Sequence, residues 1–464
     1  MNGSDFAFSR QHLSLMERDA RHVMGWRFRP EIMLGRGEGV YVWDVDDNRY
    51  FDMSAGMMSM VLGHSHPELA DVIQRMATTF VHESSWYSNP WAVEFAEKIA
   101  GTMPGDLDVV QFVVTGSEAN EVAMRMALAY TDKFDIITAM RGLHGGSLAA
   151  ESMTSVGGAR KRGLGPLMSP AVTNIVIPPH YYRAPRGIGE AEWDEVSLSL
   201  TRQLIEHSTS QCIAAIVVET IMVAGGMIVP SRRWLQGLRD IADEWEALLV
   251  LDEAQLAPGR TGTFWGFEHY DVVPDIVTFA KGMSAGFAVC GAVTTRAIAD
   301  GVKGKLGLPW AGTYPQDPLA CAVAMKQLEI VLRDGLVERC AAIGDRIGPR
   351  LERLKQQYAC VGDVRGRGSY WMLDIVRDED TKEPDVEMAE RIRYNAAAKG
   401  ALFICVKNFI RIAPPSIISD AEFDDALDRL EDAIKLAESG HPRDVELFGS
   451  GSLAANDLRQ AKAS

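Results

Sequence analysis

Between residues 65 and 325, short runs of apolar residues alternate with segments that have the periodicity of amphipathic helices. The clearest of these runs are Val109–Val114, Ile136–Ala139, Ile213–Val218, Leu248–Leu251 and Ile276–Phe279. Short, continuous apolar strands separated by helices are typical of a parallel sheet that is covered on both faces. The pattern therefore predicts a large α/β domain over residues 65–325.

The regions that flank this alternation have different patterns. Residues Gly39–Phe51 are two strand-like pieces around the turn sequence Asp-Asp-Asn, which predicts a β-hairpin within an N-terminal segment over 1–64. After residue 325, helical patterns surround a second hairpin-like segment at Val361–Val376, which predicts a smaller α+β domain over 326–440. These helical patterns span 328–336, 340–358, 386–399 and 420–437. Residues 441–464 have no apolar period, so we expect a polar tail.

The chain carries 63 acidic residues against 47 Lys and Arg, a formal net charge of −16. Nucleic acids and anionic membrane surfaces require a positive footprint, so we expect neither as a partner. No apolar stretch reaches the roughly 18 residues that span a bilayer, and the first residues lack the pattern of a signal peptide. The 6 cysteines are scattered without metal-binding spacing. We therefore expect a cytoplasmic protein with no metal site.

A strand, a turn of small residues and a helix follow one another at residues 112–121, around Thr115-Gly116-Ser117. The free N–H groups and the positive dipole at the start of such a helix can hold a phosphate, and the hydroxyls of Thr115 and Ser117 add donors. Junctions of this kind are also common packing features, so the motif alone supports both interpretations.

Two other predicted strands lead into a charged residue. Asp252 follows Leu248–Leu251, and Lys281 follows the strand at 276–279 after one alanine. Asp252 could be the magnesium-binding acid of an ATPase, but the sequence contains no G-x-x-x-x-G-K-[S/T] phosphate loop. A desolvated lysine is a good amine nucleophile toward an aldehyde, although a strand-end lysine is more commonly a surface residue.

Together, a phosphate cup, a carboxylate and a lysine are the groups that pyridoxal phosphate requires. The carboxylate pairs with the pyridine nitrogen and the lysine forms a Schiff base with the aldehyde. Because strand ends lie at one edge of a doubly wound sheet, Asp252 and Lys281 are expected to lie where such folds bind ligands. The sequence therefore predicts pyridoxal 5'-phosphate as the cofactor.

Six short motifs follow one another along the chain. They are Thr-Gly-Ser-Glu-Ala-Asn (115–120), Leu-His-Gly-Gly (143–146), Leu-Asp-Glu-Ala-Gln (251–255), Phe-Ala-Lys-Gly (279–282), Gly-Thr-Tyr-Pro-Gln-Asp-Pro-Leu-Ala (312–320) and Arg-Ile-Ala-Pro-Pro (411–415). Through them the sequence resembles the class III aminotransferases. Leu-Gly-His-Ser-His-Pro-Glu (62–68) and Gly-Asp-Val-Arg-Gly-Arg-Gly (362–368) make the dialkylglycine decarboxylases the nearest resemblance. The resemblance implies the fold-type I architecture, α/β with a mostly parallel seven-stranded sheet in a large domain plus a smaller α+β domain. It also implies a homodimer with active sites at the interface.

The resemblance further implies roles for matching residues. Lys281 would be the Schiff-base lysine and proton carrier, and Asp252 would pair with the pyridine nitrogen. Gln255 would hydrogen-bond the ring 3-oxygen, and Arg411 would clamp a substrate carboxylate, a bidentate task that lysine cannot copy. The other implied cofactor-binding residues are Thr115, Gly116, Ser117, Leu143, His144, Glu219, Ala254 and, from the other subunit, Thr313.

Departures from the family pattern bear on the reaction. Leu143 stands where the family usually has an aromatic residue, Thr220 replaces a usual proline, and Met57 stands where the decarboxylases have a glutamine. A thioether is a weak acceptor and no donor, so Met57 beside the substrate cannot grip a scissile carboxylate. Trp26 is expected to line the substrate channel.

We therefore expect amino-group transfer between an amino acid or amine and a 2-keto acid. The alternatives are decarboxylation of 2,2-dialkylglycines and, because Leu143 leaves room, epimerisation or side-chain replacement. A non-enzymatic scaffold is a further alternative, since function depends on the site and not on the fold. The intact Asp252, Gln255, Lys281 and Arg411 argue against it.

Overall fold

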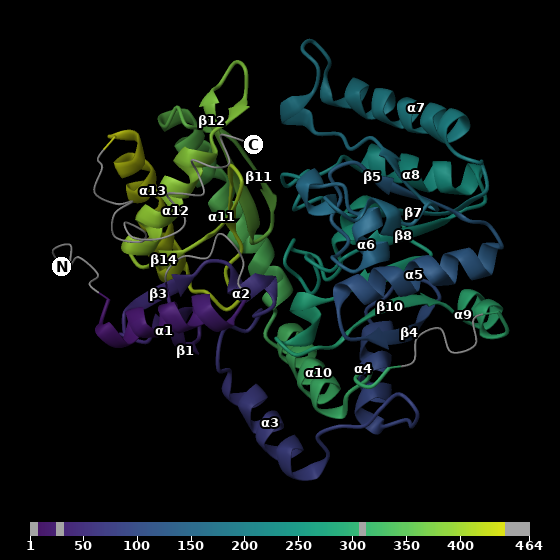
Figure 1. Cartoon of the computed structure of the whole chain (residues 1–464), viewed down its shortest axis with the longest axis horizontal. Coiled ribbons are helices and arrows are strands. Elements are labelled where there is room, and N and C mark those ends of the chain that lie inside the picture. The colour runs from purple at the N-terminus through teal and green to yellow at the C-terminus, as the bar shows by residue number, and fades with distance from the viewer. Residues whose placement is uncertain (1–7, 25–31, 306–311, 441–464) are drawn as a thin grey trace.

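A seven-stranded sheet forms the centre of the larger lobe in the computed structural model, which describes residues 8–24, 32–305 and 312–440 (Figure 1). The strands, in their order across the sheet, are β4 (Leu107–Val113), β10 (Cys290–Thr295), β9 (Ile276–Phe279), β8 (Leu248–Asp252), β7 (Ile213–Glu219), β5 (Asp135–Ala139) and β6 (Val172–Val176). Among them only β10 runs antiparallel to its neighbours. The predicted strands and the mostly parallel sheet are confirmed, whereas β6 and β10 were not predicted.

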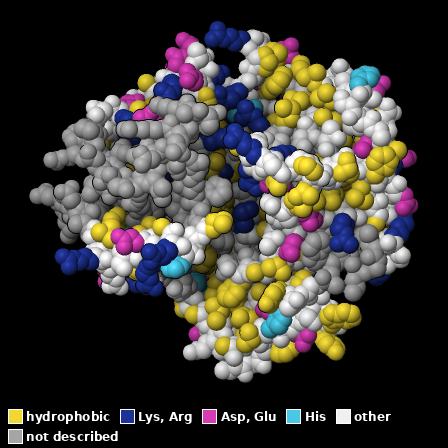
Figure 2. All heavy atoms as spheres, in the orientation of Figure 1, with side chains coloured by type: hydrophobic (Ala, Val, Ile, Leu, Met, Phe, Trp, Pro, Cys, Tyr) yellow, Lys and Arg dark blue, Asp and Glu magenta, His cyan; other side chains and the backbone are white. Residues whose placement is uncertain are grey.

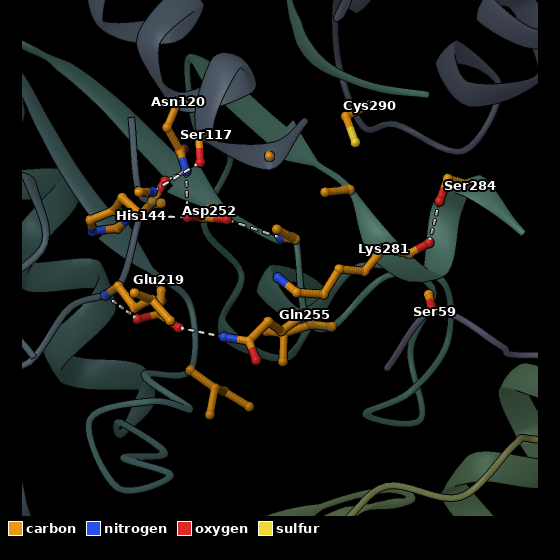
Figure 3. A pocket seen from close by; sticks show the side chains of 18 of the residues that line it. Ser59, Ser117, Asn120, His144, Glu219, Asp252, Gln255, Lys281, Ser284 and Cys290 are labelled. Carbon is orange, nitrogen blue, oxygen red and sulfur yellow. Dashed lines mark hydrogen bonds and ion pairs between the residues drawn. The ribbon is translucent and has the colours of Figure 1, made fainter. Parts of the chain in front are cut away.

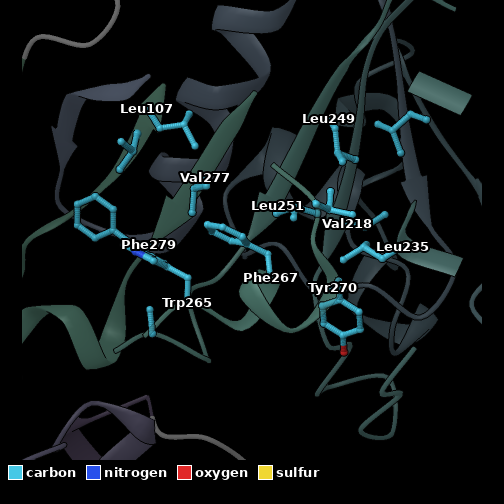
Figure 4. Close-up of a cluster of buried hydrophobic side chains, with 14 of the residues drawn as sticks. Leu107, Val218, Leu235, Leu249, Leu251, Trp265, Phe267, Tyr270, Val277 and Phe279 are labelled. Atoms are coloured by element: carbon cyan, nitrogen blue, oxygen red, sulfur yellow. The ribbon is translucent and has the colours of Figure 1, made fainter. Parts of the chain in front are cut away.

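Helices cover both faces of this sheet, which explains why its strands are continuously apolar. One face packs against α4 (Pro90–Ala100), α7 (Glu190–Ser208), α8 (Arg232–Glu244) and α10 (Pro318–Arg333). The other face packs against α5 (Gly116–Thr131), α6 (Leu148–Met153) and α9 (Arg296–Lys303). Successive residues of one strand serve different faces: Leu249 and Leu251 belong to the first core and Val250 to the second (Figure 4).

The smaller lobe brings together segments from both ends of the chain. The predicted hairpin is present as β2 (Tyr41–Asp44) and β3 (Arg49–Asp52), with β1 (Leu34–Glu38) on its outer side. Strand β3 also pairs in parallel with β14 (Ala401–Leu402). The hairpin residue Phe51 is buried in the same apolar core as the C-terminal helices, so the N-terminal strands are part of the smaller lobe.

The second sheet of the smaller lobe is antiparallel, and one side of it packs against the larger lobe. Its strands are β11 (Val361–Arg367), β12 (Tyr370–Asp378), β16 (Phe409–Ile412) and β15 (Ile404–Val406), with the short β13 (Glu383–Pro384) beside β12. Tyr370 and Phe409 pack against Ile221 and Leu256 of the larger lobe in one apolar cluster. This cluster fixes the second sheet beside the loops at the strand ends of the larger lobe.

The remaining helices agree with the sequence prediction except at one end. Helices α11 (Leu336–Gln357), α12 (Val386–Ala398) and α13 (Asp420–Glu438) lie where helical patterns were found. The pattern at 328–336 covers the end of α10, which spans Pro318–Arg333, and the turn that leads into α11. Helices α1 (Arg10–His22) and α3 (Pro67–Thr79) precede the large sheet.

The predicted division of the chain is a separate question from its elements. The predicted boundary between residues 325 and 326 lies inside α10, and the domain limits stay a prediction. The predicted tail at 441–464 lies outside the described residues. Within the described ranges, no helix combines the length and the apolarity needed to cross a bilayer.

Candidate active site

A cavity of about 440 Å³ lies at the carboxyl ends of the parallel strands (Figure 3). Its walls come from the residues that follow β5, β7, β8 and β9 and from the start of α5. Residues predicted from sequence that line it are Gly116, Ser117, Leu143, His144, Glu219, Asp252, Ala254, Gln255 and Lys281. Because parallel strands all end at one edge of the sheet, the fold brings these residues together.

The carboxylate of Asp252 is buried and fully hydrogen-bonded. Its Oδ2 accepts from Asn120 Nδ2 at 2.8 Å and lies 2.9 Å from His144 Nδ1, while its Oδ1 accepts from the amide of Ala254 at 3.1 Å. Burial raises the pKa of Asp252, but the hydrogen bond and charge of His144, with the charge of Lys281, outweigh it and hold this pKa below its usual value. Asp252 is therefore an anion that can pair with the protonated pyridine nitrogen of pyridoxal phosphate.

Asn120 is a residue of this site that the sequence assignment missed. Its Nδ2 also donates to the carbonyl of His144 at 2.8 Å, and its Oδ1 accepts from Thr278 Oγ1 at 2.9 Å. Asn120 lies four residues after Gly116 on α5, so both residues face the same side of that helix. This spacing within the Thr-Gly-Ser-Glu-Ala-Asn motif was the sequence evidence that could have identified it.

Lys281 follows β9, and its side chain extends into the cavity between Asp252 and Gln255 (Figure 3). Burial lowers the pKa of the Lys281 amine, although the carboxylates of Asp252 and Glu219 oppose this shift. The Lys281 backbone has φ of +46°, and its carbonyl accepts from Ser284 Oγ at 2.7 Å. A lowered pKa leaves more of the amine neutral, as a nucleophile or a proton acceptor requires.

Glu219 and Gln255 form a second polar group on the cavity wall. Glu219 Oε1 accepts from the amide of Leu143 at 2.8 Å, and its Oε2 accepts from Gln255 Nε2 at 3.2 Å. Burial raises the pKa of Glu219 to about 7, although the charge of His144 opposes it. Tyr370, from the smaller lobe, donates a long hydrogen bond of 3.4 Å to Gln255 Oε1. Tyr370 was not predicted, since no motif marks it.

The start of α5 forms an anion-binding corner of the cavity. The first N–H groups of a helix have no partner within the helix, and here they belong to Gly116 and Ser117. Ser117 Oγ also accepts from the amide of Gly146 at 3.0 Å. Thr115 is exposed and lies outside the cavity lining. Its hydroxyl and the Glu118 carboxylate instead form the capping box that begins the helix.

The predicted substrate residues and Thr313 are not in the cavity wall. Arg411 lies on β16 in the smaller lobe, 6% exposed, and its Nε has no hydrogen-bond partner among the described residues. Met57 is 55% exposed and lies outside the lining. Thr313 is exposed and likewise outside its own chain's cavity. Trp26 lies outside the described residues.

Pyridoxal phosphate fits the residues that are present. The α5 terminus offers free amides for a phosphate, Asp252 is held ionised, and the amine of Lys281 lies in the same cavity. The Cβ of any larger residue at Gly145 would come within 2.2 Å of Ser117 Oγ, so only glycine allows this close approach beside the anion-binding corner. In the described part of the chain, no group of three or more His, Cys, Asp or Glu could hold a metal ion.

Comparisons with known proteins identify the family of this chain. The sequence model of the family described as "Aminotransferase class-III" matches residues 26–434. A probable 4-aminobutyrate aminotransferase of Bacillus subtilis is 33% identical, with 86% of this chain and 92% of that protein covered. An alanine/serine racemase of Pyrococcus horikoshii is 31% identical, with 86% and 85% covered. The crystal structure of an (S)-enantioselective omega-transaminase from Thermomicrobium roseum superposes with a TM-score of 0.86 at 30% identity, covering 94% of this chain and 99% of that one.

Proposed function

Because this chain belongs to the class III aminotransferases, we propose that the cavity at the strand ends is its active site and that Lys281 carries the reaction. The chain is a pyridoxal-phosphate-dependent enzyme of fold type I, and it transfers an amino group from an amino acid or amine to a 2-keto acid. These four predictions, on family, fold class, cofactor and reaction class, are confirmed. The observation that supports the site is the meeting of Lys281, Asp252 and the α5 terminus in one cavity.

The residues that would hold the cofactor follow from their chemistry. Gly116 and Ser117 would bind the phosphate through backbone amides, and Gln255 would hydrogen-bond a ring oxygen. Asp252, held ionised by His144 and Asn120, would keep a proton on the ring nitrogen. When bound, pyridoxal phosphate withdraws electrons from the substrate carbon that carries the amino group.

Lys281 would move the proton in this reaction. Its amine would hold the cofactor covalently in the resting enzyme, and as a free amine it would accept a proton from the substrate carbon. Its lowered pKa favours the neutral form needed for that task. Asp252 and Glu219 lie close enough to influence that pKa, so the wall of the cavity sets the basicity of Lys281.

Arg411 supports a substrate that bears a carboxylate. A buried guanidinium needs partners for its N–H groups, and Arg411 Nε has no hydrogen-bond partner among the described residues. Its charge lowers the pKa of Lys281, which places the two residues within electrostatic reach. Met57, the residue at the position of the decarboxylases' glutamine, lies outside the cavity lining and its thioether has no donor to hold a scissile carboxylate. We therefore propose transamination, and not decarboxylation, as the main reaction.

The direct test is a panel of amino donors with pyruvate, with alanine measured as the product. Carboxylate-bearing donors should outperform matched amines, and Arg411→Lys should reduce this preference because lysine cannot bind a carboxylate bidentately. Release of carbon dioxide from 2-aminoisobutyrate as fast as turnover of the best donor would contradict transamination as the main reaction. Racemisation of alanine at that rate would do the same.

A homodimer with shared active sites is the second part of the proposal. Two exposed segments meet on the surface, because Ser85 Oγ donates to the carbonyl of Gly312 at 3.0 Å and Gln316 Nε2 donates to that of Tyr87 at 2.9 Å. The aromatic side chains exposed there are Trp86 (77%), Tyr87 (70%) and Tyr314 (59%). Exposed apolar patches of this kind mark interaction sites, and twofold dimers are the commonest assemblies.

Thr313 lies in this patch, next to Tyr314, and would complete the phosphate site of the partner subunit. Mixing inactive Lys281→Ala and Thr313→Ala proteins should then restore activity, because a hybrid dimer contains one site with both residues intact. Hybrids without activity would contradict shared sites.

The free cysteines, most of them buried, support a cytoplasmic location.

A further inference from the structure

A second cavity, of about 470 Å³, lies at the seam between the two lobes. On the larger lobe it is lined by the segment after β6, which includes His180 and Tyr182. On the smaller lobe it is lined by the end of α11 and by the β11–β12 hairpin, with Lys355, Arg365 and Trp371. It shares no lining residue with the active-site cavity, and the function proposed above does not use it.

This seam cavity contains buried polar atoms without partners. His180 is 6% exposed, and neither Nδ1 nor Nε2 has a hydrogen-bond partner among the described residues. The hydroxyl of Tyr182 also lacks one. Buried polar atoms are normally satisfied by protein, water or ligand, so each of these atoms calls for a partner. Burial and the nearby arginines lower the pKa of His180 to about 2, so the ring is neutral and offers one donor and one acceptor.

Positive charge is in excess around these atoms. Arg183 and Arg365 share the buried carboxylate of Asp374, each with a contact of 3.0 Å. Arg365 and Lys355 share a second carboxylate, that of Asp363, at 2.6 and 2.7 Å. These three cations therefore share two carboxylates as ion-pair partners.

Two further cations adjoin the cavity with carbonyl partners. Arg141 Nη1 donates to the carbonyl of Gly225 at 3.2 Å, and Lys382 Nζ donates to that of Tyr182 at 2.5 Å while lying 4.6 Å from its ring centre. Two more acids lie here, Glu190 at the exposed rim of the lining and the buried Asp194, whose Oδ1 accepts from the hydroxyl of Tyr181 at 2.7 Å, so five cations face four anions. Figure 2 shows Lys and Arg side chains gathered along the hollow between the lobes, in a chain whose net charge is −16.

We propose that the seam cavity binds a small organic carboxylate, with His180 and Tyr182 as its hydrogen-bond donors. The donor groups and the surrounding positive charge suit an anion, since hydrogen bonds to a charged acceptor are the stronger kind. The rings of Tyr181 and Trp371 line the same cavity and suit a flat apolar body. A carboxylate attached to a flat apolar group matches both the donors with their positive charge and the aromatic rings. Inorganic phosphate matches only the positive charge.

A ligand here bridges the two lobes beside the active site. Arg365 already joins them, because its Nε and Nη2 donate to the carbonyl of Gly226 at 3.0 and 2.8 Å. Gly226 lies on the loop that follows Glu219, and this loop also contributes Ile221 to the active-site wall. A ligand that contacts both lobes should raise the unfolding midpoint of the holoenzyme, since it binds only the assembled form.

The test is isothermal titration calorimetry of the holoenzyme with benzoate, which carries no amino or keto group for the reaction. Benzamide has the same ring without the charge, and inorganic phosphate has charge without the ring. We expect benzoate to bind with a stoichiometry of one per chain and benzamide to bind at least about tenfold more weakly. Tyr182→Phe, which removes one oxygen atom, should weaken benzoate by about fivefold or more. The matched control is Tyr130→Phe on α5, 38% exposed and outside the lining.

The remaining outcomes separate this site from its alternatives. Benzoate affinity that falls in Arg411→Lys but not in Tyr182→Phe would assign binding to the active site and overturn the proposal. Phosphate binding as tightly as benzoate, or no binding of benzoate at 10 mM, would overturn it too. The inactive Lys281→Ala protein should still bind benzoate at the seam, because Lys281 is not part of that cavity. A failure of the proposed catalytic role would therefore leave this result unchanged.

Discussion

Two buried carboxylates on neighbouring strands end up with opposite acidities. Glu219 at the end of β7 and Asp252 at the end of β8 lie directly opposite each other in the parallel ladder. The pKa of Asp252 is held below its usual value, whereas burial raises the pKa of Glu219 to about 7. The two acids have the same depth and sheet register, so the difference in pKa comes from their hydrogen-bond partners and from the charge of Asp252, which raises the pKa of Glu219.

The partners of the two carboxylates differ in charge. Asp252 Oδ2 receives both the Asn120 amide and His144, whose charge favours the anion. Glu219 receives uncharged amide donors, from the backbones of Leu143 and Val223 and the side chain of Gln255, and these do not offset its desolvation. The site thereby holds one fixed anion and one group that can change protonation near neutral pH, with Lys281 facing both.

Removing Lys281 should have the largest effect on kcat. Its amine is the group on which both carboxylates act. Lys281→Ala should reduce kcat by at least about 1,000-fold, since it loses covalent attachment of the cofactor and the proton carrier together. Borohydride reduction followed by peptide mapping should place the cofactor on Lys281 in the parent enzyme. The control is Lys303→Ala, exposed on α9, and a label on any other lysine would contradict the assignment.

Neutralising Asp252 comes next and tests the fixed anion. Asp252→Asn should retain the cofactor but lower kcat by at least about 100-fold, because the ring nitrogen loses its charge partner. Absorbance of the bound cofactor and steady-state kinetics measure the two parts. Asp300→Asn, which changes an exposed acid on α9, serves as the matched control. Equal kcat in Asp252→Asn and the parent enzyme would refute the role of the anion.

Removing His144 should raise the pKa of Asp252 toward that of Glu219. In His144→Leu the carboxylate loses a hydrogen bond and a favourable charge, so its pKa should rise. Activity requires the ionised form, and the acidic limb of the kcat/KM profile should therefore move to higher pH. His144→Gln keeps an amide donor and should shift the limb less. A limb that does not move would show that Asp252 does not control it.

Glu219→Gln tests the titrating group through the free energy of unfolding and not through kcat. The folded pKa of about 7 exceeds the ordinary value of 4.5, so the folded protein keeps a proton that the unfolded chain releases between these values. The contribution of Glu219 to stability is present below pH 4.5 and is lost as pH rises through 7. Glutamine has no such dependence, so the variant should gain about 3 kcal/mol on the parent between pH 4.5 and pH 8.

Chemical unfolding of both proteins at the two pH values measures this difference. Any effect of glutamine on packing is common to both conditions and cancels in the comparison. Glu246→Gln, whose side chain is 91% exposed, should show no such gain. No gain would mean that the folded pKa of Glu219 is not raised, and a change of the opposite sign would mean that it lies below the ordinary value.

The sequence was sufficient to predict residues that lie within one strand and the turn after it. Asp252 and Lys281 were predicted because each directly follows a continuous apolar run, and this local pattern fixes the strand and its polar end together. The start of α5 was predicted for the same reason, since glycine and hydroxyl residues between a strand and a helix occupy a few adjacent positions.

Contacts across large sequence separations were out of reach. Asn120 and Asp252 are 132 residues apart, and Tyr370 reaches Gln255 from 115 residues away in the other lobe. The pairing of β3 with β14, which joins Phe51 to Ala401, unites segments from the two ends of the chain. No local periodicity encodes such pairings, because they depend on how complete elements pack.

The sequence by itself therefore determined which reactive groups the enzyme possesses and which sheet edge holds them. Only the tertiary structure decided their protonation states, because desolvation and hydrogen-bond partners come from elements far apart in the chain. Asp252 and Glu219 look alike in sequence, each an acid after an apolar strand. His144, from the loop after β5, makes one of them a permanent anion, and its absence from the hydrogen bonds of the other leaves a titrating acid.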